Sequence, residues 1–194
     1  MFWAVWLGSF LVGGIPFGLI LVKWRKGVDV RRQGSSNIGA TNVLRLYGRG
    51  LGGLTLLFDV SKGAVPVWLS RDFFRLAPAE IAVSGCLAFL GHLYSPYLGW
   101  KGGKGVSTAV GVISVLCFPA AIAATIAFAT LFLSTGWVSV GSLCGALIQA
   151  LWFWTHDIED AYRWLSLVLL VGIVFRHRQN IQRIRLGTEP RTRL

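Results

Sequence analysis

Charge is scarce in this 194-residue sequence: 14% of its residues are charged, against about a quarter in ordinary soluble domains. The few charges are one-sided, with 19 Lys and Arg against 8 Asp and Glu. Hydrophobic residues make up 54% of the chain, and several apolar runs approach the roughly 20 residues that cross a bilayer. We therefore expect an all-α integral membrane protein in which residues 1–194 form a single polytopic domain.

The sequence is also poor in the residues that build metal centres and disulfides. Its three cysteines, Cys86, Cys117 and Cys144, lie in apolar segments without paired spacing, which argues against a disulfide framework and a zinc site. The basic segments contain only two acids, Asp29 and Glu189, so a two-carboxylate metal site has little support. We expect neither a metal nor a cofactor.

The basic residues that are present occupy three segments. Residues 23–49 hold seven, Lys101 and Lys104 add two, and residues 176–193 hold six. Because cytoplasmic loops are enriched in Lys and Arg, these segments and the C-terminus are predicted to be cytoplasmic and the N-terminus to lie outside. A net charge of +11 also occurs in nucleic-acid-binding proteins, but cations beside spans set topology and meet anionic lipid. Membrane lipid is the expected partner, and nucleic acid is not.

The expected spans number seven transmembrane helices, some of them short. Leaving the cytoplasm after the glycine-rich turn and returning at Arg176 requires an even number of crossings, and the uncharged region 105–155 is too long for one. Pro119 and the Ser134-Thr135-Gly136 cluster mark plausible breaks. The alternative is five spans with a re-entrant segment. The clearer candidate spans are Phe2–Val22, Gly52–Ser70, Pro78–Tyr97 and Tyr162–Phe175.

Three polar segments fall on the predicted cytoplasmic side. They read QGSSNIGATNVLR (33–45), GHLYSPYLGWKGGKGVST (91–108) and RHRQNIQRIRLGTE (176–189), and they share hydroxyls, amides and cations. A P-loop is excluded because Lys104 is followed by glycine rather than Ser or Thr. The G-x-S-x-G nucleophile elbow is absent as well. What remains is a phosphate-binding surface without an evident protein nucleophile.

These segments resemble, in order and over nearly the whole chain, the three signature motifs of the acyl-phosphate-dependent glycerol-3-phosphate acyltransferases of bacteria, the PlsY family. The matching elements are S-x-N-x-G-A-T-N, G-H with the following K-G-G-K-G, and H-x-x-N-I-x-R with a later G-x-E. Where the family commonly has glycine, this chain has Ser36.

The resemblance implies transfer of a fatty acyl group from acyl phosphate to the 1-hydroxyl of glycerol 3-phosphate. The products would be lysophosphatidic acid and phosphate, in bacterial phospholipid synthesis. The enzyme would be a multi-pass protein of the bacterial inner membrane with its active site facing the cytoplasm. None of the three histidines is followed by the His-x-x-x-x-Asp pattern of acyltransferases that use soluble donors. Glycerol 3-phosphate and acyl phosphate are thus the expected substrates.

Roles for the glycine turn follow from this match. Lys104 is expected to act in catalysis, and Gly102, Gly103 and Gly105 to present backbone N–H groups to the donor's phosphate or to the oxyanion. The simpler interpretation is a helix-entry turn with an incidental lysine.

The other two motifs carry over in the same way. Ser35 and Asn37 are expected to act in catalysis and Arg45 to bind glycerol 3-phosphate, although SSN is also an ordinary turn sequence. His177 and Asn180, spaced i, i+3, are further catalytic candidates, and Glu189 is expected to be a structural partner. The remaining candidate substrate contacts are Thr41, Asn42, Ser142 and Arg183.

No conventional protein base is left among these residues, so the attacking hydroxyl is expected to lose its proton to a phosphate oxygen of the donor. Asp59 and Lys62, i, i+3 apart within a span, are expected to form an ion pair that holds the second span against its neighbours. The competing function is a membrane transporter of an organic phosphate, although such a site should lie near the bilayer midplane. The working expectation for the oligomeric state is a monomer.

Overall fold

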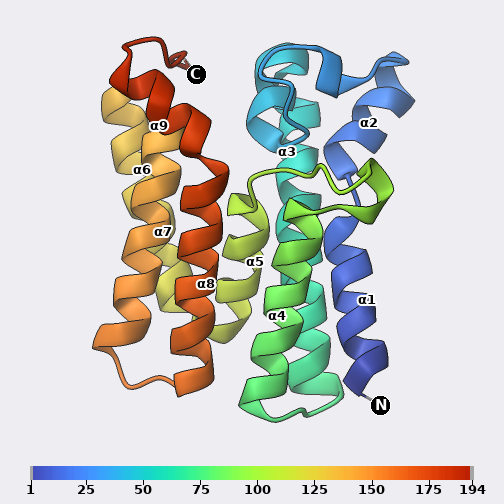
Figure 1. Cartoon of the computed structure of the whole chain (residues 1–194), viewed down its shortest axis with the longest axis vertical. Coiled ribbons are helices and arrows are strands. Elements are labelled where there is room, and N and C mark those ends of the chain that lie inside the picture. Colours follow the sequence, from blue (N-terminus) through green and yellow to red (C-terminus); the bar gives the residue numbers. More distant parts are fainter. Residues whose placement is uncertain (1, 193–194) are drawn as a thin grey trace.

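The computed structural model of the chain describes residues 2–192, and every regular element within them is helical (Figure 1). The all-α expectation is confirmed; Arg193, the last of the cations counted above, lies outside the described residues. Short 3-10 turns at Val30–Arg32 and Pro96–Leu98 and a π-helical turn at Leu69–Phe73 connect the longer helices. Those are α1 (Phe2–Gly14), α2 (Phe17–Lys26), α3 (Ala40–Trp68), α4 (Pro78–Leu93), α5 (Val106–Leu116), α6 (Phe118–Thr135), α7 (Val138–Thr155), α8 (Asp160–Arg176) and α9 (Arg178–Arg185).

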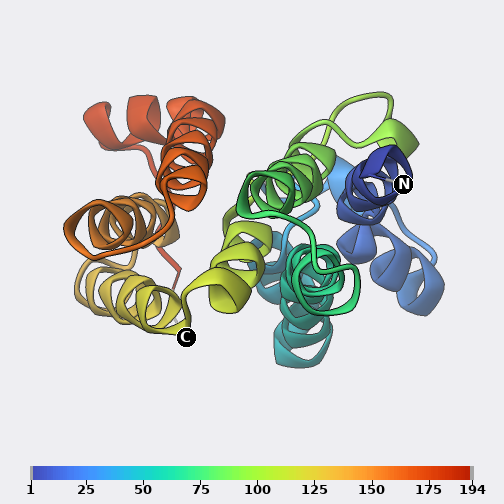
Figure 2. The ribbon, with the colours of Figure 1, turned by 90° about the horizontal axis from the view of Figure 1, so that it is seen from below.

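The helices form two groups, with α1 to α4 in one, α6 to α9 in the other and α5 between them (Figure 2). Glycine allows α5 to lie directly on α3, because a Cβ on Gly63 would stand 2.1 Å from the Thr108 carbonyl oxygen and one on Gly111 would stand 2.0 Å from that of Val60. Small residues at helix contacts are how helices in membranes approach one another closely. Close packing on α3 therefore fixes the position of α5, the helix that follows the glycine-rich turn.

The first predicted span, residues 2–22, is two helices rather than one. α1 and α2 meet at a 43° bend around Ile15 and Pro16, where proline lacks the N–H that a continuous helix needs. The free carbonyls at this break are satisfied by side chains: Lys62 donates to Ile15 O at 2.7 Å and Ser95 donates to Gly14 O at 2.6 Å.

The expected ion pair within α3 is present, with Lys62 Nζ 2.7 Å from Asp59 Oδ1 and both side chains almost fully buried. Because the same ammonium group also donates to Ile15 O at the α1–α2 break, the pair holds α3 against its neighbours α1 and α2, as predicted. Removing one partner of such a pair destabilises the protein, because the other charge is then buried without a counter-ion.

The breaks expected in the uncharged region are found. α5 ends at Leu116, α6 begins at Phe118, and Gly136 ends α6 in the left-handed conformation with φ 75°. By length and composition, three helices of the described residues can span a membrane, or four if α1 and α2 count as one bent span. At about 1.5 Å per residue the 11-residue α5 is roughly half as long as a bilayer core is thick. The count of seven crossings stays a prediction.

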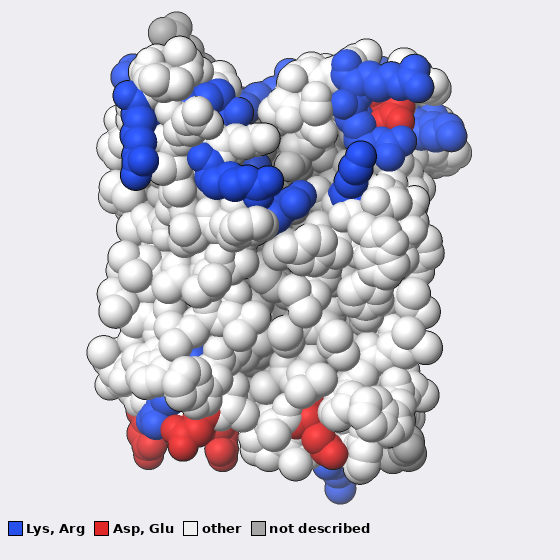
Figure 3. Space-filling view, viewed as in Figure 1, with Lys and Arg blue, Asp and Glu red and all other residues white. Residues whose placement is uncertain are grey.

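Charge is distributed along the long axis of the molecule. Lys and Arg gather at the end that carries α2 and α9, whereas the opposite end carries most of the acidic surface (Figure 3). At that opposite end Arg163 pairs with Asp160 at 2.7 Å and Arg71 pairs with Asp72 at 2.9 Å. The basic residues of all three polar motifs thus share one end of the protein.

Candidate active site

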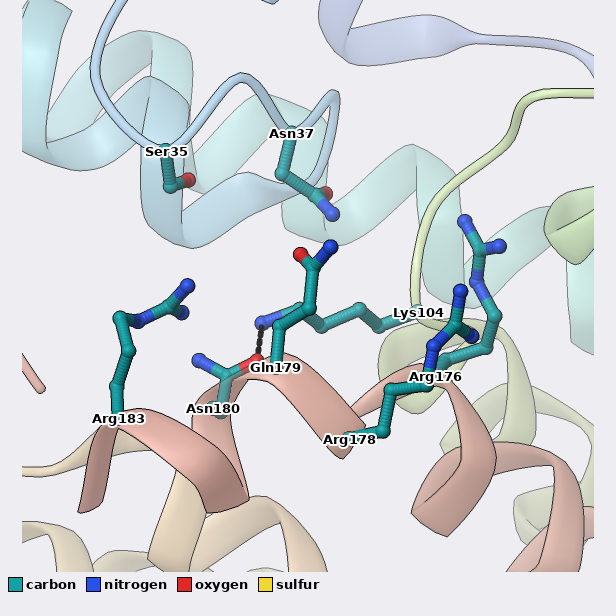
Figure 4. Close-up of a pocket in the computed structure, with 8 residues that line it drawn as sticks. All are labelled: Ser35, Asn37, Lys104, Arg176, Arg178, Gln179, Asn180 and Arg183. Atoms are coloured by element: carbon teal, nitrogen blue, oxygen red, sulfur yellow. Dashed lines mark hydrogen bonds between the residues drawn. The ribbon is translucent and has the colours of Figure 1, made fainter. Parts of the chain in front are cut away.

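The three polar motifs converge on one cavity at the basic end of the molecule. It has a volume of about 190 Å³, and Figure 4 shows its wall built from the loop before α3, the turn before α5 and the α8–α9 junction. Four of the lining residues are cations and none is a carboxylate. The lining residues are Ser35, Asn37, Lys104, Arg176, Arg178, Gln179, Asn180 and Arg183.

The loop before α3 is held by Asn42. Its Oδ1 accepts the Ser35 N–H at 3.0 Å, and its Nδ2 donates to the carbonyls of Asn37 at 2.8 Å and Gln33 at 3.2 Å. The side chain is buried and both of its polar atoms serve the loop backbone. The expectation that Asn42 binds substrate is therefore wrong: Asn42 shapes the loop that presents Ser35 and Asn37 to the cavity.

Two further features of this loop follow from its fold. Asn37 Oδ1 accepts the Gly39 N–H at 2.9 Å, which closes the turn and leaves the Asn37 amide nitrogen directed at the cavity (Figure 4). Ser36 takes φ 56°, the left-handed conformation that glycine adopts without strain. The position where the sequence departs from the family pattern is thus one where the backbone favours glycine.

The glycines of the turn before α5, Gly102, Gly103 and Gly105, pack against the end of α4. The N–H groups of Gly102 and Gly103 donate to Leu93 O at 3.1 Å and His92 O at 3.0 Å, so the prediction that these two amides face a phosphate is wrong. A Cβ on Gly102 would stand 2.0 Å from His92 O, and one on Gly103 would stand 2.2 Å from His92 Nε2. Gly105 has φ 83° and abuts the Phe89 ring. These glycines let the turn lie flat on the end of α4.

Arg176 secures the other side of this turn. Its guanidinium donates to Gly103 O at 2.9 Å and to Gly102 O at 2.6 Å. The turn is therefore fixed from α4 on one side and from the end of α8 on the other. These contacts fix the backbone of Gly102 and Gly103, and with it the position of Lys104, which follows Gly103 in the chain.

Lys104 is hydrogen-bonded across the cavity wall. Its Nζ donates to Asn180 Oδ1 at 2.7 Å (Figure 4), and Asn180 Nδ2 in turn donates to Glu189 Oε1 at 2.6 Å. Burial lowers the pKa of the Lys104 ammonium to about 8; the neighbouring guanidinium groups add to this shift and the Glu189 carboxylate opposes it. The ammonium still carries its charge at neutral pH.

Glu189 is the acceptor at the centre of this network. Besides Asn180, it accepts from Ser139 Oγ at 2.8 Å and from Arg183 Nε at 2.8 Å. Burial raises the pKa of Glu189, but the side-chain hydrogen bonds outweigh burial and the pKa lies below its usual value. Glu189 was predicted to be a structural partner of a loop cation or a backbone amide; its partners are instead the side chains of Arg183 and Asn180 on α9 and of Ser139 on α7.

His177 lies at the hinge between α8 and α9 and is 2% exposed. Its Nδ1 is 2.8 Å from the carbonyl oxygen of Ile173, so Nδ1 carries the proton and Nε2 the lone pair. Burial, reinforced by the positive charge of Lys104, lowers the pKa of His177 to about 4. At neutral pH the ring is uncharged and only weakly basic.

Three further candidates lie outside the cavity lining, as do Asn42, His177 and the glycines of the turn. Arg45 Nε donates to Thr192 Oγ1 at 2.7 Å. Thr41 lies in the first turn of α3. Ser142 Oγ donates to Val138 O of its own helix at 2.8 Å, and its contact with substrate stays a prediction. Ser139, one turn earlier, donates to Glu189.

Three lining residues were not predicted as site residues, namely Arg176, Arg178 and Gln179. They flank His177 in the third motif, where the sequence suggested that the arginines only set topology. The signal that could have identified them is their place in the third motif beside His177 and Asn180; in the structure, four of the five residues 176–180 line the cavity. Within the described residues, no cluster of His, Cys, Asp and Glu is suited to holding a metal ion.

The family model for glycerol-3-phosphate acyltransferase matches residues 3–187 of this chain. The chain belongs to the glycerol-3-phosphate acyltransferase family. The resemblance to PlsY stated from the motifs is confirmed.

Curated members of this acyltransferase family match the chain over nearly its full length. The glycerol-3-phosphate acyltransferase of Myxococcus xanthus is 43% identical over 189 residues, covering 97% of this chain and 98% of the relative. That of Syntrophotalea carbinolica is 40% identical over 190 residues, covering 98% of this chain and 97% of the relative.

The fold agrees with solved acyltransferase structures. A crystal structure of PlsY, an integral membrane glycerol 3-phosphate acyltransferase, in its glycerol 3-phosphate form matches with a TM-score of 0.95 at 32% identity, covering 99% of this chain and 96% of that one. The lysophosphatidic acid form of PlsY matches with a TM-score of 0.93 and covers 99% and 95% of the two chains. The all-helical architecture of this chain is therefore that of an integral membrane acyltransferase.

Proposed function

We propose that this protein transfers a fatty acyl group from acyl phosphate to the 1-hydroxyl of glycerol 3-phosphate. The observation that carries the proposal is the cavity, which joins all three motifs and is lined by four cations and no carboxylate. Both proposed substrates are phosphate anions, and both products, lysophosphatidic acid and inorganic phosphate, are anions as well. The family of the chain and the glycerol 3-phosphate and lysophosphatidic acid forms of PlsY support the acceptor and the product of this proposal.

The lining groups divide the work between two phosphates. Arg183 and Lys104 supply charge to the acceptor's phosphate, and Ser35 and Asn37 offer a hydroxyl and an amide that orient the glycerol hydroxyls. Arg178 lies on the other side of Lys104 (Figure 4) and suits the phosphate that leaves. Lys104 and Asn180, hydrogen-bonded to each other between these groups, face the carbonyl under attack.

The chemical step needs no protein base. The 1-hydroxyl oxygen forms a bond to the acyl carbonyl carbon, the bond from that carbon to the phosphate oxygen breaks, and the hydroxyl proton passes to a phosphate oxygen of the donor. His177 is a poor base because its pKa is about 4. The lining cations stabilise the oxyanion and the departing phosphate, and fixed positions of the two substrates supply much of the rest.

The remaining features of the proposal concern location. The basic end of the molecule would face the cytoplasm, where charged substrates are available, and the single acyltransferase domain would be embedded in a bacterial inner membrane as a monomer. The cations at this end favour contact with anionic headgroups. Apolar helices below the cavity would border the acyl chain.

The test is formation of lysophosphatidic acid by purified protein in detergent or lipidic mesophase. Glycerol 3-phosphate is supplied with either acyl phosphate or acyl-CoA. We expect product from acyl phosphate alone, and about 100-fold less of it after Lys104→Ala, a loss typical of one transition-state donor. Lys101→Ala is the matched control, because Lys101 is exposed in the same turn and does not line the cavity.

Each other result has a definite meaning. Product from acyl-CoA instead would overturn the donor assignment but keep the acceptor. Equal losses in the two lysine variants would remove Lys104 from the site. No product from either donor would contradict the enzyme proposal and lead to liposome uptake assays for a transporter of organic phosphates.

A further inference from the structure

The last described residues, 189–192, form a strap across the basic end of the protein. Three contacts anchor it to the α6–α7 turn: Thr192 N–H donates to Gly136 O at 2.8 Å, Trp137 Nε1 donates to the Glu189 carbonyl oxygen at 3.2 Å, and the Arg191 guanidinium lies 5.4 Å from the Trp137 ring centroid. The strap is thus tied to the α6–α7 turn at three points.

From this anchored position the strap reaches the other helix group. Arg45, on α3, donates to Thr192 Oγ1 from Nε at 2.7 Å and also from Nη2. The two residues are 147 positions apart in the chain, and the Thr192 side chain is largely buried, with 9% of the residue exposed. Since α3 and α7 belong to different helix groups (Figure 2), this contact joins the two groups beside the cavity.

The resemblance makes Arg45 an expected contact for the phosphate of glycerol 3-phosphate, in addition to Arg183 and Lys104 of the cavity lining. We propose that Thr192 is a positioning residue for Arg45: it holds the guanidinium from one edge so that the other edge is presented to the acceptor's phosphate. This inference rests on the proposed function, since it assumes that Arg45 meets that phosphate.

The geometry leaves the guanidinium with donors to spare. It has five N–H groups in a planar fork, and two of them, one on Nε and one on Nη2, are used by Thr192. Three remain, enough for a bidentate contact with a phosphate. Arg45 is near enough to Arg183, a cavity-lining residue, for their charges to interact. A guanidinium fixed at Nε cannot turn away from that neighbour, so less rotational freedom is lost when the anion binds.

The chemistry of the holding group matters as well. A neutral hydroxyl accepts from the guanidinium without cancelling its charge, whereas a carboxylate in the same place would compete with the phosphate. The nearby carboxylate, Glu189, is occupied by Arg183, Asn180 and Ser139. Arg45 is therefore held by an oxygen that leaves its positive charge available.

The test uses the full-length enzyme and three substitutions. Thr192→Val keeps the shape but removes the acceptor oxygen, Thr192→Ser keeps the oxygen, and Thr188→Val makes the same change at an exposed threonine whose hydrogen bonds go to the Arg183 carbonyl and not to Arg45. We expect Thr192→Val to raise KM for glycerol 3-phosphate about tenfold, because it removes the oxygen that accepts both hydrogen bonds from Arg45. Its kcat should change by less than about twofold, because Arg45 is proposed to bind the acceptor's phosphate equally in the ground state and in the transition state. Thr192→Ser and Thr188→Val should match the wild type.

A second cycle shows whether the effect passes through Arg45. In an Arg45→Lys background, where the fork is absent, Thr192→Val should cause no further rise in KM. A KM unchanged or lowered by Thr192→Val would overturn the proposal, as would an equal rise in the Arg45→Lys background. A loss of thermal stability shared by Thr192→Val and Thr192→Ser, with KM unchanged, would make the residue merely structural.

Calorimetric titration with glycerol 3-phosphate alone separates this inference from the reaction proposed above. If the wild type binds glycerol 3-phosphate but forms no product, the proposed reaction fails while the titration still compares the variants. If the wild type forms product and Thr192→Val binds glycerol 3-phosphate as the wild type does, the positioning role fails alone.

Discussion

At the scale of single residues, the protonation state of Lys104 should govern the pH dependence of the reaction. Its pKa is lowered to about 8, chiefly by burial, whereas an ordinary lysine titrates near 10.4. The charged form is the one that attracts phosphate. As pH rises through about 8 the ammonium loses its proton, and kcat/KM for glycerol 3-phosphate should fall. That fall reports an acid in the free enzyme and not a base, because kcat/KM follows ionisations of the free enzyme and substrate.

Lys104→Arg provides the decisive comparison, since a guanidinium keeps its charge throughout this range. The variant should retain some activity and lose the decline above pH 8. The measurement is kcat/KM as a function of pH for both proteins, with glycerol 3-phosphate binding measured over the same range in case turnover of the variant is too slow. A decline at the same pH in both proteins would assign the ionisation to another group.

The residues in and around the cavity differ in how far the sequence alone reveals their roles. Lys104, Asn180, Ser35 and Asn37 line the cavity and were predicted from the resemblance of their motifs to those of the PlsY family; on chemistry alone, Ser35 and Asn37 also fit an ordinary turn. The role of Asn42 was not predictable, since its partners lie on backbone brought close only by the folded loop. The same holds for Thr192, whose partner Arg45 is 147 positions away.

At the scale of elements, helix ends that depend on a single proline or glycine were predicted correctly. Pro119 and Gly136 mark the ends of α6 because proline and left-handed glycine disrupt a helix whatever surrounds them. The break at Pro16 carries the same signal, yet the hydrophobicity of residues 2–22 masked it. The glycine turn misled for a different reason: its freed amides suggested an anion cradle, but the end of α4 supplies the carbonyls that bind Gly102 and Gly103.

The packing role of that turn gives a prediction for the turn as a unit. Gly103→Ala should destabilise the protein by about 1–3 kcal/mol through overpacking, because the added Cβ would meet the His92 ring, whose Nε2 is 2.2 Å away. His92→Ala removes that ring. The Gly103→Ala/His92→Ala double variant should therefore be nearly as stable as His92→Ala alone. Thermal unfolding in detergent measures the stability of each variant, and acyl transfer at saturating substrate measures its activity.

Gly102→Ala is the matched comparison for this pair. Its Cβ would meet backbone, the His92 carbonyl oxygen at 2.0 Å, and no side-chain truncation at residue 92 removes a backbone atom. His92→Ala should therefore rescue Gly103→Ala and leave Gly102→Ala impaired. Normal stability of Gly103→Ala with lost activity would instead show that Gly103 acts on substrate directly.

At the scale of the whole molecule, the described chain begins and ends at opposite ends of the bundle (Figure 1), and the basic motifs occupy the end near the C-terminus (Figure 3). Opposite ends require an odd number of crossings, which both seven and five satisfy. The positive-inside rule then directs the basic end to the cytoplasm. Orientation is therefore testable without knowing how α5 and its neighbours divide the bilayer.

The test replaces one exposed residue at each end with cysteine: Arg185→Cys in α9 and Asp157→Cys in the α7–α8 turn, both exposed. The background removes the three native thiols, which are partly buried, by changing Cys86, Cys117 and Cys144 to Ala. In intact spheroplasts a membrane-impermeant maleimide should label Asp157→Cys and spare Arg185→Cys, and lysis should expose both. Labelling of Arg185→Cys from outside would place the cavity on the outer face, away from cytoplasmic glycerol 3-phosphate, and would contradict the proposed orientation. Protection of both residues before lysis would require an even number of crossings between Asp157 and Arg185. The structure does not allow that, because the two residues lie at opposite ends of the molecule.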